Sequence, residues 1–440
     1  MKIGLIAMSG IRVCDQELLE LGLTFPGVVE RSKVISSMPS LGLLTLAGMT
    51  PEKHKISYIE SEDIKDFSQI PTDFDLVGIS TYSAQIFEAY ELSEKYRKAG
   101  VAVVMGGPHV SLLPEEAALH CDCVVIGEGE LHWLNILEDF EAGKLNKFYG
   151  KIDNSFDFKN APMPAYELLD LKKYNRLTVQ TSRGCPHLCS FCGSSTILSN
   201  VYKQKPIEKV LAEIDKIRTL WKKPFIELAD DNSFVNRNYW KQLLPQIAKR
   251  RINWFTETDI SIGKDKELLK LLKESRCAEV LIGLESPNQS NLNNLEVKNN
   301  WKFNQWKEYK RLVRNIQSFG IRVNGCFILG LDNQDENIFD EVFNFANELE
   351  IYDVQITVLT PFPNTILHKE LIAQGRMIED KAWQKCTLFD LNFVPQNMSV
   401  DALKKGFKYL SSKLYSDEQV AWRRRNFEDK YLLGNGELFE

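Results

Sequence analysis

Short apolar runs alternate with amphipathic stretches over residues 1–145. An amphipathic stretch between two apolar runs is typical of a βαβ unit, in which a helix connects two parallel strands. The pattern predicts helices over Gln85–Lys98 and Glu130–Phe140. The predicted strands are Ile3–Met8, Ile56–Glu60, Leu76–Ser80, Ala102–Met105 and Cys123–Ile126. Residues 1–145 are therefore expected to form a doubly wound, Rossmann-like α/β domain, with its ligand beyond the carboxyl ends of the strands.

Residues 146–175 show little periodicity and contain Pro162 and Pro164, so a connector is expected there. From Leu177 the alternation resumes. The strands predicted in this part are Leu177–Thr181, Pro224–Leu228, Asn253–Glu257, Glu279–Gly283, Arg322–Ile328 and Asp353–Val358. The helices predicted between them are Ile207–Thr219, Asn238–Arg250, Lys266–Glu274, Lys302–Phe319 and Glu336–Leu349. About six repeats predict a partial (βα)6 TIM-like barrel over residues 176–374, because a closed barrel needs eight.

The last segment, residues 375–440, is expected to be small and mostly helical, with a helix over Leu403–Leu414. Its aromatic residues either cover a large apolar substrate or fill a small core, and the sequence leaves both open. These residues are Trp383, Phe389, Phe393, Phe407, Tyr409, Tyr415 and Trp422. A short basic run, Arg423 to Arg425, is expected on a solvated helix face.

Three cysteines, Cys185, Cys189 and Cys192, follow the predicted strand Leu177–Thr181 in a C-x-x-x-C-x-x-C pattern. Three thiolates can hold three irons of a cubane [4Fe–4S] cluster, which normally takes four protein thiolates. No fourth cysteine is nearby in sequence, so one iron is left for a ligand that is not protein. The spacing favours this interpretation over a zinc site or chance.

The loop, including Phe191 before its third cysteine, resembles the signature of radical S-adenosylmethionine (SAM) enzymes. That resemblance implies a [4Fe–4S] cluster held by Cys185, Cys189 and Cys192, with SAM chelated to the open iron. In the family, an electron from the reduced cluster cleaves SAM and yields a 5′-deoxyadenosyl radical.

Further motifs at the predicted strand ends resemble SAM-binding positions of the same family. By this resemblance, Glu285 and Ser286 face the ribose and methionyl part of SAM. Asp230 or Asp231 lies near the methionyl amino group or the substrate, and Glu257 and Asp259 close another strand at the same rim. The adenine is flanked by Phe327, Ile328 and Leu329. A carboxylate at a strand end can also be merely solvated, and this alternative remains open for the acidic residues.

Glycine motifs at strand ends of the first domain, together with Pro39–Gly42, resemble the cobalamin-binding domain fused to many radical SAM enzymes. The positions that match are Ser80, Thr81, Gly106, Gly107, His109, Gly127, Glu128 and Gly129. The Asp-x-His-x-x-Gly motif is absent, which argues against a histidine ligand to cobalt. His109 itself either bonds to the protein or contacts cobalamin through its ring.

The composition bears on nucleic-acid binding, on membrane insertion and on disulfide formation. The 440 residues carry a net charge of −6, so no general basic footprint for nucleic acid is present. No apolar run reaches the ~18 residues of a membrane span, and a cytoplasmic protein is expected. The six cysteines outside the loop show no paired framework, and most are expected to be buried apolar residues.

The function predicted from these motifs is cobalamin-dependent methylation of an unactivated carbon, by way of the SAM-derived radical and methylcobalamin. The substrate is expected to be a small or lipid-like molecule, and an external low-potential donor is expected to reduce the cluster. An enzyme with the same cofactors that catalyses cyclisation, ring contraction or oxidation is an alternative. A cobalamin- and cluster-binding sensor without turnover is another.

Overall fold

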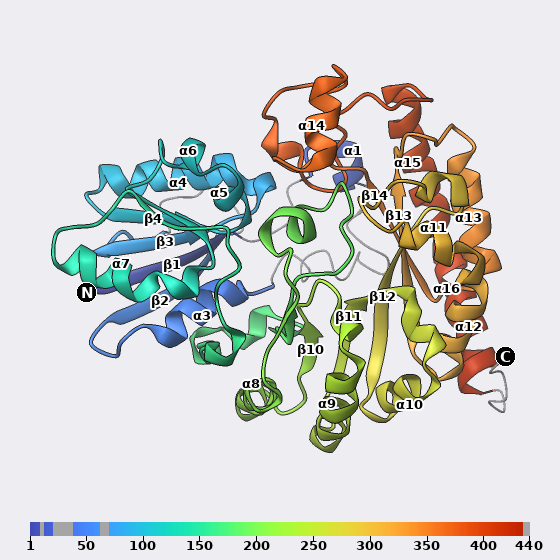
Figure 1. The fold of residues 1–440 in the computed structure, drawn as a ribbon, viewed down its shortest axis with the longest axis horizontal. Coiled ribbons are helices and arrows are strands. Elements are labelled where there is room, and N and C mark those ends of the chain that lie inside the picture. Colours follow the sequence, from blue (N-terminus) through green and yellow to red (C-terminus); the bar gives the residue numbers. More distant parts are fainter. Residues whose placement is uncertain (9–12, 21–37, 62–69, 434–440) are drawn as a thin grey trace.

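The computed structural model describes residues 1–8, 13–20, 38–61 and 70–433 (Figure 1). The first domain is built on a six-stranded parallel sheet with the strand order β2-β1-β3-β4-β5-β6. Its strands are β1 (Lys2–Met8), β2 (Lys55–Ser61), β3 (Leu76–Ser80), β4 (Ala102–Gly106), β5 (Cys123–Gly127) and β6 (Phe148–Lys151). The five predicted strands are confirmed to within one residue at each end.

Helices cover both faces of this sheet, which explains its nearly unbroken apolar strands. Ile3 and Leu5 of β1 pack with α3 (Leu41–Met49) and α7 (Trp133–Glu141) on one face. Ile6 and Met8 pack with α4 (Ile86–Lys98), α5 (Pro108–Leu112) and α6 (Pro114–Ala117) on the other. Successive side chains of a strand point to opposite faces, so one strand serves both cores. The doubly wound architecture is confirmed.

Strand β6 lies in the segment that the sequence predicts only as a connector. It pairs in parallel with β5, from Val124 opposite Phe148 to Gly127 opposite Lys151. Its residues Phe-Tyr-Gly-Lys are mostly exposed because they form the edge of the sheet. A short, exposed edge strand lacks the apolar run by which the other strands are found, and the connector prediction is wrong over these four residues.

The second domain holds another six-stranded parallel sheet, with the order β14-β13-β12-β11-β10-β7. The strands are β7 (Leu177–Val179), β10 (Phe225–Leu228), β11 (Asn253–Thr258), β12 (Cys277–Glu285), β13 (Arg322–Leu329) and β14 (Asp353–Val358). Because the strands follow in chain order and the first and last do not pair, the sheet is an open, partial barrel, as predicted.

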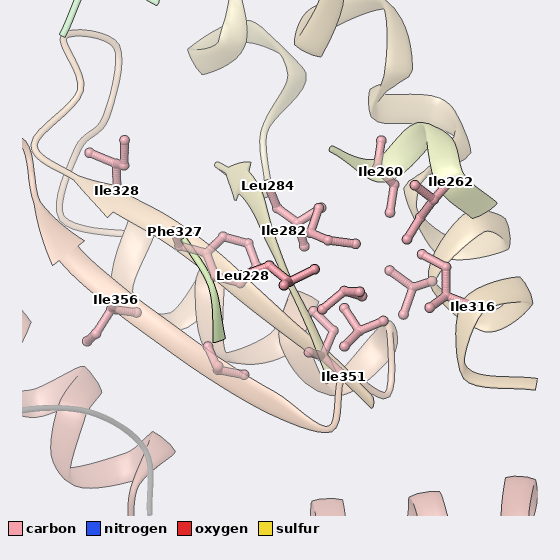
Figure 2. Close-up of a cluster of buried hydrophobic side chains, with 14 of the residues drawn as sticks. Leu228, Ile260, Ile262, Ile282, Leu284, Ile316, Phe327, Ile328, Ile351 and Ile356 are labelled. Carbon is pink, nitrogen blue, oxygen red and sulfur yellow. The ribbon is translucent and has the colours of Figure 1, made fainter. Parts of the chain in front are cut away.

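The helices of this domain cover one side of the sheet (Figure 1). They are α8 (Ile207–Leu220), α9 (Arg237–Arg250), α10 (Lys266–Glu274), α12 (Tyr309–Ser318) and α13 (Ile338–Glu348). Figure 2 shows part of the core between the two layers, where Ile282 and Leu284 of β12 meet Ile316 of α12. The helix predicted over Lys302–Phe319 is divided into α11 (Trp301–Gln305), a 3-10 turn and α12, so a single helix was wrong.

The barrel part of the chain ends with α14 (Ile366–Ala373), and the C-terminal segment after it is mostly helical, with α15 (Val400–Leu414) and α16 (Asp417–Phe427). Phe389, Phe393 and Phe407 lie in the same core as the barrel, which favours the core-filling alternative for these three. Trp383 instead packs into the core of the first domain.

The solvated position expected for Arg423 is wrong. Its side chain is buried and its Nη1 donates to the carbonyl of Leu414 at 2.8 Å. No helix in the described part of the chain is long and apolar enough to cross a lipid bilayer.

Two glycines of α3 provide a test of this packing. A Cβ on Gly48 would lie 1.8 Å from the carbonyl oxygen of Met163, whereas a Cβ on Gly42 would have nothing within 4 Å. We expect Gly48→Ala to lose about 1–3 kcal/mol of stability through overpacking against backbone. Gly42→Ala, the matched control, should gain up to about 1 kcal/mol from helix propensity. Denaturant unfolding of both variants measures the difference; equal stabilities would contradict the close approach.

Candidate active site

The three cysteines lie in a loop at the carboxyl end of β7. The loop is closed at its base by a two-residue antiparallel ribbon, β8 (Ser182–Arg183) with β9 (Lys203–Gln204). Gly184 begins the loop with a φ of +92°, and a Cβ there would lie 2.6 Å from the carbonyl oxygen of Val201. A side chain at this position would therefore open the loop, which explains the glycine before the first cysteine.

Backbone contacts hold the loop on the barrel rim. Ser190 N donates to the carbonyl of Leu295 at 2.9 Å, and Leu367 N donates to the carbonyl of Ser190 at 3.1 Å. Cys189 forms a β-bridge with Glu296. The thiol-bearing loop is thus fixed from two sides, by the segment after β12 and by the start of α14.

The three thiols are partly or fully shielded from water. Cys189 is buried and the other two are half-buried. Burial raises the pKa of Cys185 to about 11, and the nearby charge of Cys192 adds to it. Asn232 Nδ2 lies 3.9 Å from Cys185 Sγ and can donate to it. A metal binds the thiolate, so loading iron onto these thiols releases their protons.

No three His, Cys, Asp or Glu side chains of the described residues surround a single metal ion. A cubane differs from such a site because each of its irons takes one protein thiolate. Three thiols from one loop, partly shielded from water and close enough for their charges to interact, fit three irons of a cluster.

His187 lies between two carboxylates rather than at a metal. Its Nδ1 is 3.1 Å from Glu296 Oε1 and its Nε2 is 3.3 Å from Asp259 Oδ2. Burial lowers its pKa, but the bonds to Asp259 and Glu296 outweigh burial and raise the pKa to about 9. Its ring also packs against Trp301 at 4.5 Å. The cation fastens the loop to the barrel, which agrees with a loop-packing role.

The acidic pair Asp230 and Asp231 also holds the loop. Asp230 is buried and accepts from Thr181 N at 2.7 Å, Ser182 N at 2.9 Å and the hydroxyls of Thr181 and Ser233. Asp231 accepts from Gly184 N at 2.7 Å and from the Ser194 hydroxyl. The partners of Asp230 therefore lie within the protein, and Asp231 is the exposed member of the pair.

Glu285 ends β12 with a left-handed φ of +64°, where the register with β13 shifts. Lys302 Nζ donates to its Oε1 at 2.6 Å and to the carbonyl of Gly283 at 3.0 Å. Ser286 is fully buried and its Oγ accepts from Asn291 Nδ2 at 3.0 Å. Lys302, which the sequence did not indicate, neutralises the carboxylate predicted to bind SAM.

The three residues predicted to flank adenine differ in orientation. Phe327 packs against Phe345 of α13 at 6.3 Å between ring centres, on the helix-covered side. Alternation along β13 places Ile328 on the other face, with half-buried Cys326. All three side chains belong to the buried core, where Phe327 and Leu329 are fully buried and Ile328 retains slight exposure. Phe191 is half-buried and packs against the same core.

Carboxylates also line the interior of the barrel. Glu257 is exposed, yet protein surrounds it, and burial together with the charges of Glu227 and Asp231 raises its pKa to about 8. Glu227 is paired with Arg176 at 2.5 Å. Tyr82, which follows β3 of the first domain, is 66% exposed. Desolvation and the charge of Glu227 both raise the pKa of its hydroxyl. Tyr82 of the first domain is therefore electrostatically coupled to a carboxylate of the barrel.

The glycine positions predicted for cobalamin lie together at the carboxyl ends of β3, β4 and β5. Gly107 has a φ of +99°, and a Cβ there would lie 2.9 Å from the carbonyl oxygen of Thr81. Gly127 has a φ of +80°, and its Cβ would lie 2.6 Å from the carbonyl of Lys151. Both glycines are therefore required by neighbouring backbone. Gly106 and Gly129 have room for a Cβ, so backbone crowding does not explain them.

His109 and Glu128 have partners within the protein. His109 is completely buried, with Nδ1 3.0 Å from Ser83 Oγ and Nε2 3.4 Å from Glu116 Oε1. Of its two alternatives, bonding to the protein is the one that this geometry favours. Glu128 forms ion pairs with Arg183 and Lys203 of the loop base. These two cations were not predicted from the sequence, although Arg183 lies two residues before the first cysteine.

Two family models match this chain. The radical SAM superfamily matches residues 179–346, and the B12 binding domain matches residues 28–136. The bacteriochlorophyllide d C-8(2)-methyltransferase of Chlorobaculum tepidum is 28% identical over 87% of this chain and 86% of its own length. The hopanoid C-2 methylase of Rhodopseudomonas palustris is 26% identical over 79% of this chain and 67% of its own length.

Two solved structures share the whole architecture. TsrM of Kitasatospora setae, a radical S-adenosylmethionine methyltransferase with cobalamin and a [4Fe-4S] cluster bound, matches with a TM-score of 0.63 at 16% identity, over 85% of this chain and 75% of its own. OxsB, a cobalamin-dependent S-adenosylmethionine radical enzyme, matches with a TM-score of 0.68 at 17% identity, over 98% of this chain and 71% of its own. At these identities the likeness shows the fold.

The fold and both domain matches define an enzyme class that combines a cobalamin domain with a radical SAM barrel. This chain carries a radical SAM domain over residues 179–346 and a B12-binding domain over residues 28–136. The radical SAM domain implies a [4Fe–4S] cluster and SAM as cofactors, and the B12-binding domain implies cobalamin.

The buried Glu285–Lys302 pair gives the first prediction for the site. Lys302→Met leaves a buried carboxylate without its cation, and we expect a loss of about 3–5 kcal/mol. The double variant Lys302→Met/Glu285→Gln removes the unpaired charge and should recover most of that loss. Denaturant unfolding followed by tryptophan fluorescence measures both. A double variant as unstable as the single one would contradict the pairing.

The raised pKa of Glu257 gives a second prediction, which concerns how stability depends on pH. An ordinary glutamate ionises near pH 4.5, whereas this carboxyl in the folded protein ionises near pH 8. Between these values the unfolded chain releases a proton that the folded chain keeps, so the stabilising contribution of Glu257 is lost as the pH rises. We expect the melting temperature of the natural protein to fall relative to Glu257→Gln between pH 5 and 8, and to level off above. Exposed Glu267→Gln is the control; equal slopes for the two variants would contradict the shift.

Proposed function

We propose that this protein is a cobalamin-dependent radical SAM C-methyltransferase acting on an unactivated carbon of a small or lipid-like molecule. The observation that carries the proposal is the position of the three-cysteine loop. It lies at the carboxyl end of one parallel sheet and is bound by ion pairs to the carboxyl end of the other. Its relatives named above are methyltransferases of bacteriochlorophyllide d and of hopanoids.

The roles proposed for the residues follow from their places. Cys185, Cys189 and Cys192 hold three irons, while Glu285, Ser286 and Ile328 lie on the SAM side of the rim. Ser80, Thr81, Gly106 and Gly129 line the cobalamin side. The bound cluster and SAM supply a hydrogen-abstracting carbon radical, and bound cobalamin supplies the methyl group.

The protein's own contribution is to position the substrate and to limit access of water between the two domains. Glu257, largely protonated at neutral pH, can donate a hydrogen bond to a substrate oxygen or nitrogen. Residues 1–145, 146–175, 176–374 and 375–440 are kept as the proposed division into cobalamin domain, connector, barrel and C-terminal segment, with β6 extending the first sheet into the connector. We further propose an external electron donor, no nucleic-acid partner and a cytoplasmic location.

A second function has one observation in its favour. The anaerobic magnesium-protoporphyrin IX monomethyl ester cyclase of Cereibacter sphaeroides is 26% identical over 75% of this chain and 58% of its own length. A cyclase or oxidase with the same cofactors would convert its substrate without adding carbon. The mass of the product separates the two functions, because methylation adds one CH2 unit.

The proposal is tested by anaerobic reconstitution with iron, sulfide and cobalamin, followed by SAM-cleavage and product analysis. We expect 5′-deoxyadenosine and a product heavier by one methylene. Each of the variants Cys185→Ala, Cys189→Ala and Cys192→Ala should lose the cluster absorption and all 5′-deoxyadenosine. Cys14→Ala is the matched control, because Cys14 is an exposed thiol outside the loop. SAM cleavage that persists in the three loop variants would rule out the mechanism.

A further inference from the structure

The base of the cysteine loop presents two cations on one face. In the antiparallel ribbon β8–β9, Arg183 is directly opposite Lys203. Directly opposite residues of an antiparallel pair project their side chains to the same side. Two like charges in this position repel each other and destabilise the ribbon unless an anion lies between them.

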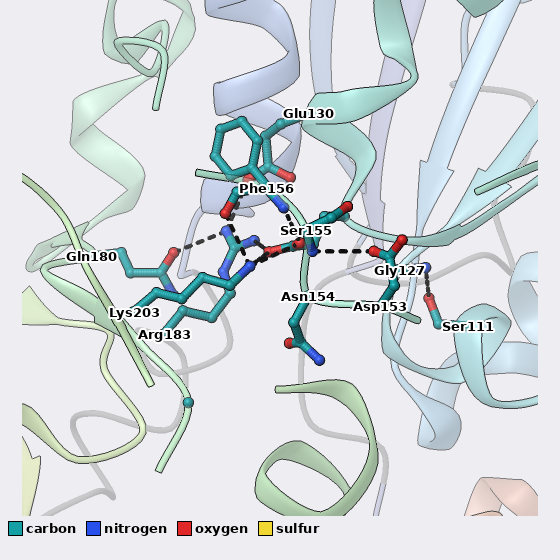
Figure 3. A network of polar contacts seen from close by, with 12 residues as sticks. Ser111, Gly127, Glu130, Asp153, Asn154, Ser155, Phe156, Gln180, Arg183 and Lys203 are labelled. Carbon is teal, nitrogen blue, oxygen red and sulfur yellow. Dashed lines mark hydrogen bonds and ion pairs between the residues drawn. The ribbon is translucent and has the colours of Figure 1, made fainter. Parts of the chain in front are cut away.

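Glu128 of the first domain supplies that anion. Figure 3 shows the two cations together with Glu130. Arg183 Nη1 lies 3.0 Å from Glu128 Oε1, and Lys203 Nζ lies 2.8 Å from the same oxygen and 3.0 Å from Oε2. The backbone N of Phe156, in the connector, donates to Oε2 at 2.8 Å. One carboxylate therefore joins the cobalamin domain, the connector and both strands at the base of the cysteine loop.

Glu130 completes the network from the same turn. Arg183 Nη2 donates to Glu130 Oε1 at 2.8 Å and to Gln180 Oε1 at 3.1 Å. Burial alone would raise the pKa of Glu130, but the charge and hydrogen bond of Arg183 outweigh burial and hold that pKa below its usual range. The guanidinium also lies over the ring of Phe158, 4.8 Å from its centre.

The four charged side chains are largely shielded from water. Their exposed fractions are 20% for Arg183, 12% for Lys203, 9% for Glu128 and 12% for Glu130. A charged group with so little contact with water is stabilised mainly by its ion-pair partner. Removing one partner of such a pair is therefore strongly destabilising. Among the described residues, the ion pairs of these four side chains all cross between the two domains, which couples the relative position of the domains to this network.

The coupling reaches the cysteines directly. Cys185 is two residues after Arg183, and Gly184 between them is tied to Asp231 by its N–H at 2.7 Å. Arg183 and the first thiol are therefore carried by the same short, anchored stretch of backbone. On the other side, Glu128 and Glu130 follow β5, where Gly127 is fixed by Lys151 and by Ser111, whose Oγ accepts from Gly127 N at 2.9 Å.

We propose that Arg183 and Lys203 are positioning residues. Through their ion pairs with Glu128 and Glu130, they set the distance between the cysteine loop and the carboxyl end of the first sheet, where cobalamin is proposed to bind. The inference rests on the proposed function, in which one substrate carbon must meet both a radical and a methyl donor. Misplacement by about 1 Å can cost about a hundredfold in rate in such a reaction. The network then governs how efficiently radical formation leads to methylation, without contacting the substrate.

The variant Glu130→Gln tests the proposal, because Glu130 is not among the proposed cobalamin contacts. We expect the reconstituted variant to keep its cluster and cobalamin and to cleave SAM, while the ratio of methylated product to 5′-deoxyadenosine falls roughly tenfold or more. Arg183→Lys keeps the positive charge but removes the planar guanidinium that contacts both carboxylates. It should lower the ratio of methylated product to 5′-deoxyadenosine in the same way. Glu348→Gln, which removes an exposed ion pair with Lys310, is the matched control.

Hydrogen exchange provides a readout that does not depend on methylation. In Glu130→Gln, amides of residues 182–204 in the other domain should exchange faster, and in Glu348→Gln they should not. An unchanged ratio, unchanged exchange, or a loss of cluster that accounts for all lost activity would overturn the positioning role. If the natural protein forms no methylated product but the exchange effect is present, the proposed function fails and the interdomain coupling stands.

Discussion

Arg183, Lys203, Glu128 and Glu130 compensate one another's charge where the carboxyl ends of the two parallel sheets meet. Parallel sheets place their binding loops at that end, so two such domains can share a substrate only when these edges face each other. Apolar packing could join the edges as well, but it is non-directional. Paired charges with fixed hydrogen-bond geometry define a single arrangement, at the energetic cost of removing four charged groups from water.

The same principle recurs around the cysteine loop. The acidic side chains at the strand ends already have partners within the protein. Asp230 bonds to the end of β7, Asp259 to His187, and Glu285 to Lys302. A loop whose own residues form little regular structure needs such contacts to hold three thiols in a defined arrangement. The carboxylates therefore support the site as well as line it, and Glu257 and Asp231 are the ones left exposed toward the interior.

A second connection between the domains runs through the C-terminal segment. Trp383 packs into the core of the first domain and its Nε1 donates to Glu116 Oε2 at 3.2 Å, while the other oxygen of Glu116 faces His109. Asn364 Nδ2 adds a bond to the carbonyl of Leu112 at 2.6 Å. The chain thus leaves the barrel and returns to the first domain, which is joined to the rest of the chain by these contacts as well as by the base of the cysteine loop.

The sequence alone predicted five strands of the first sheet, the six strands of the second, their parallel arrangement and the cluster loop, because apolar runs, strand-end glycines and cysteine spacing are local signals. It missed β6, whose exposed edge position needs no apolar run, and it could not assign partners to Glu128, His109 or Asp230. Those assignments depend on which distant groups lie within about 3 Å of each other: Arg183 is 55 residues from Glu128, and Trp383 is 267 residues from Glu116. Residue type shows that a carboxylate can bind a cofactor. Only the tertiary structure decides whether that carboxylate is already paired with a cationic side chain of the protein. Electrostatic and hydrogen-bonding energies depend on distance in space and not on separation along the chain.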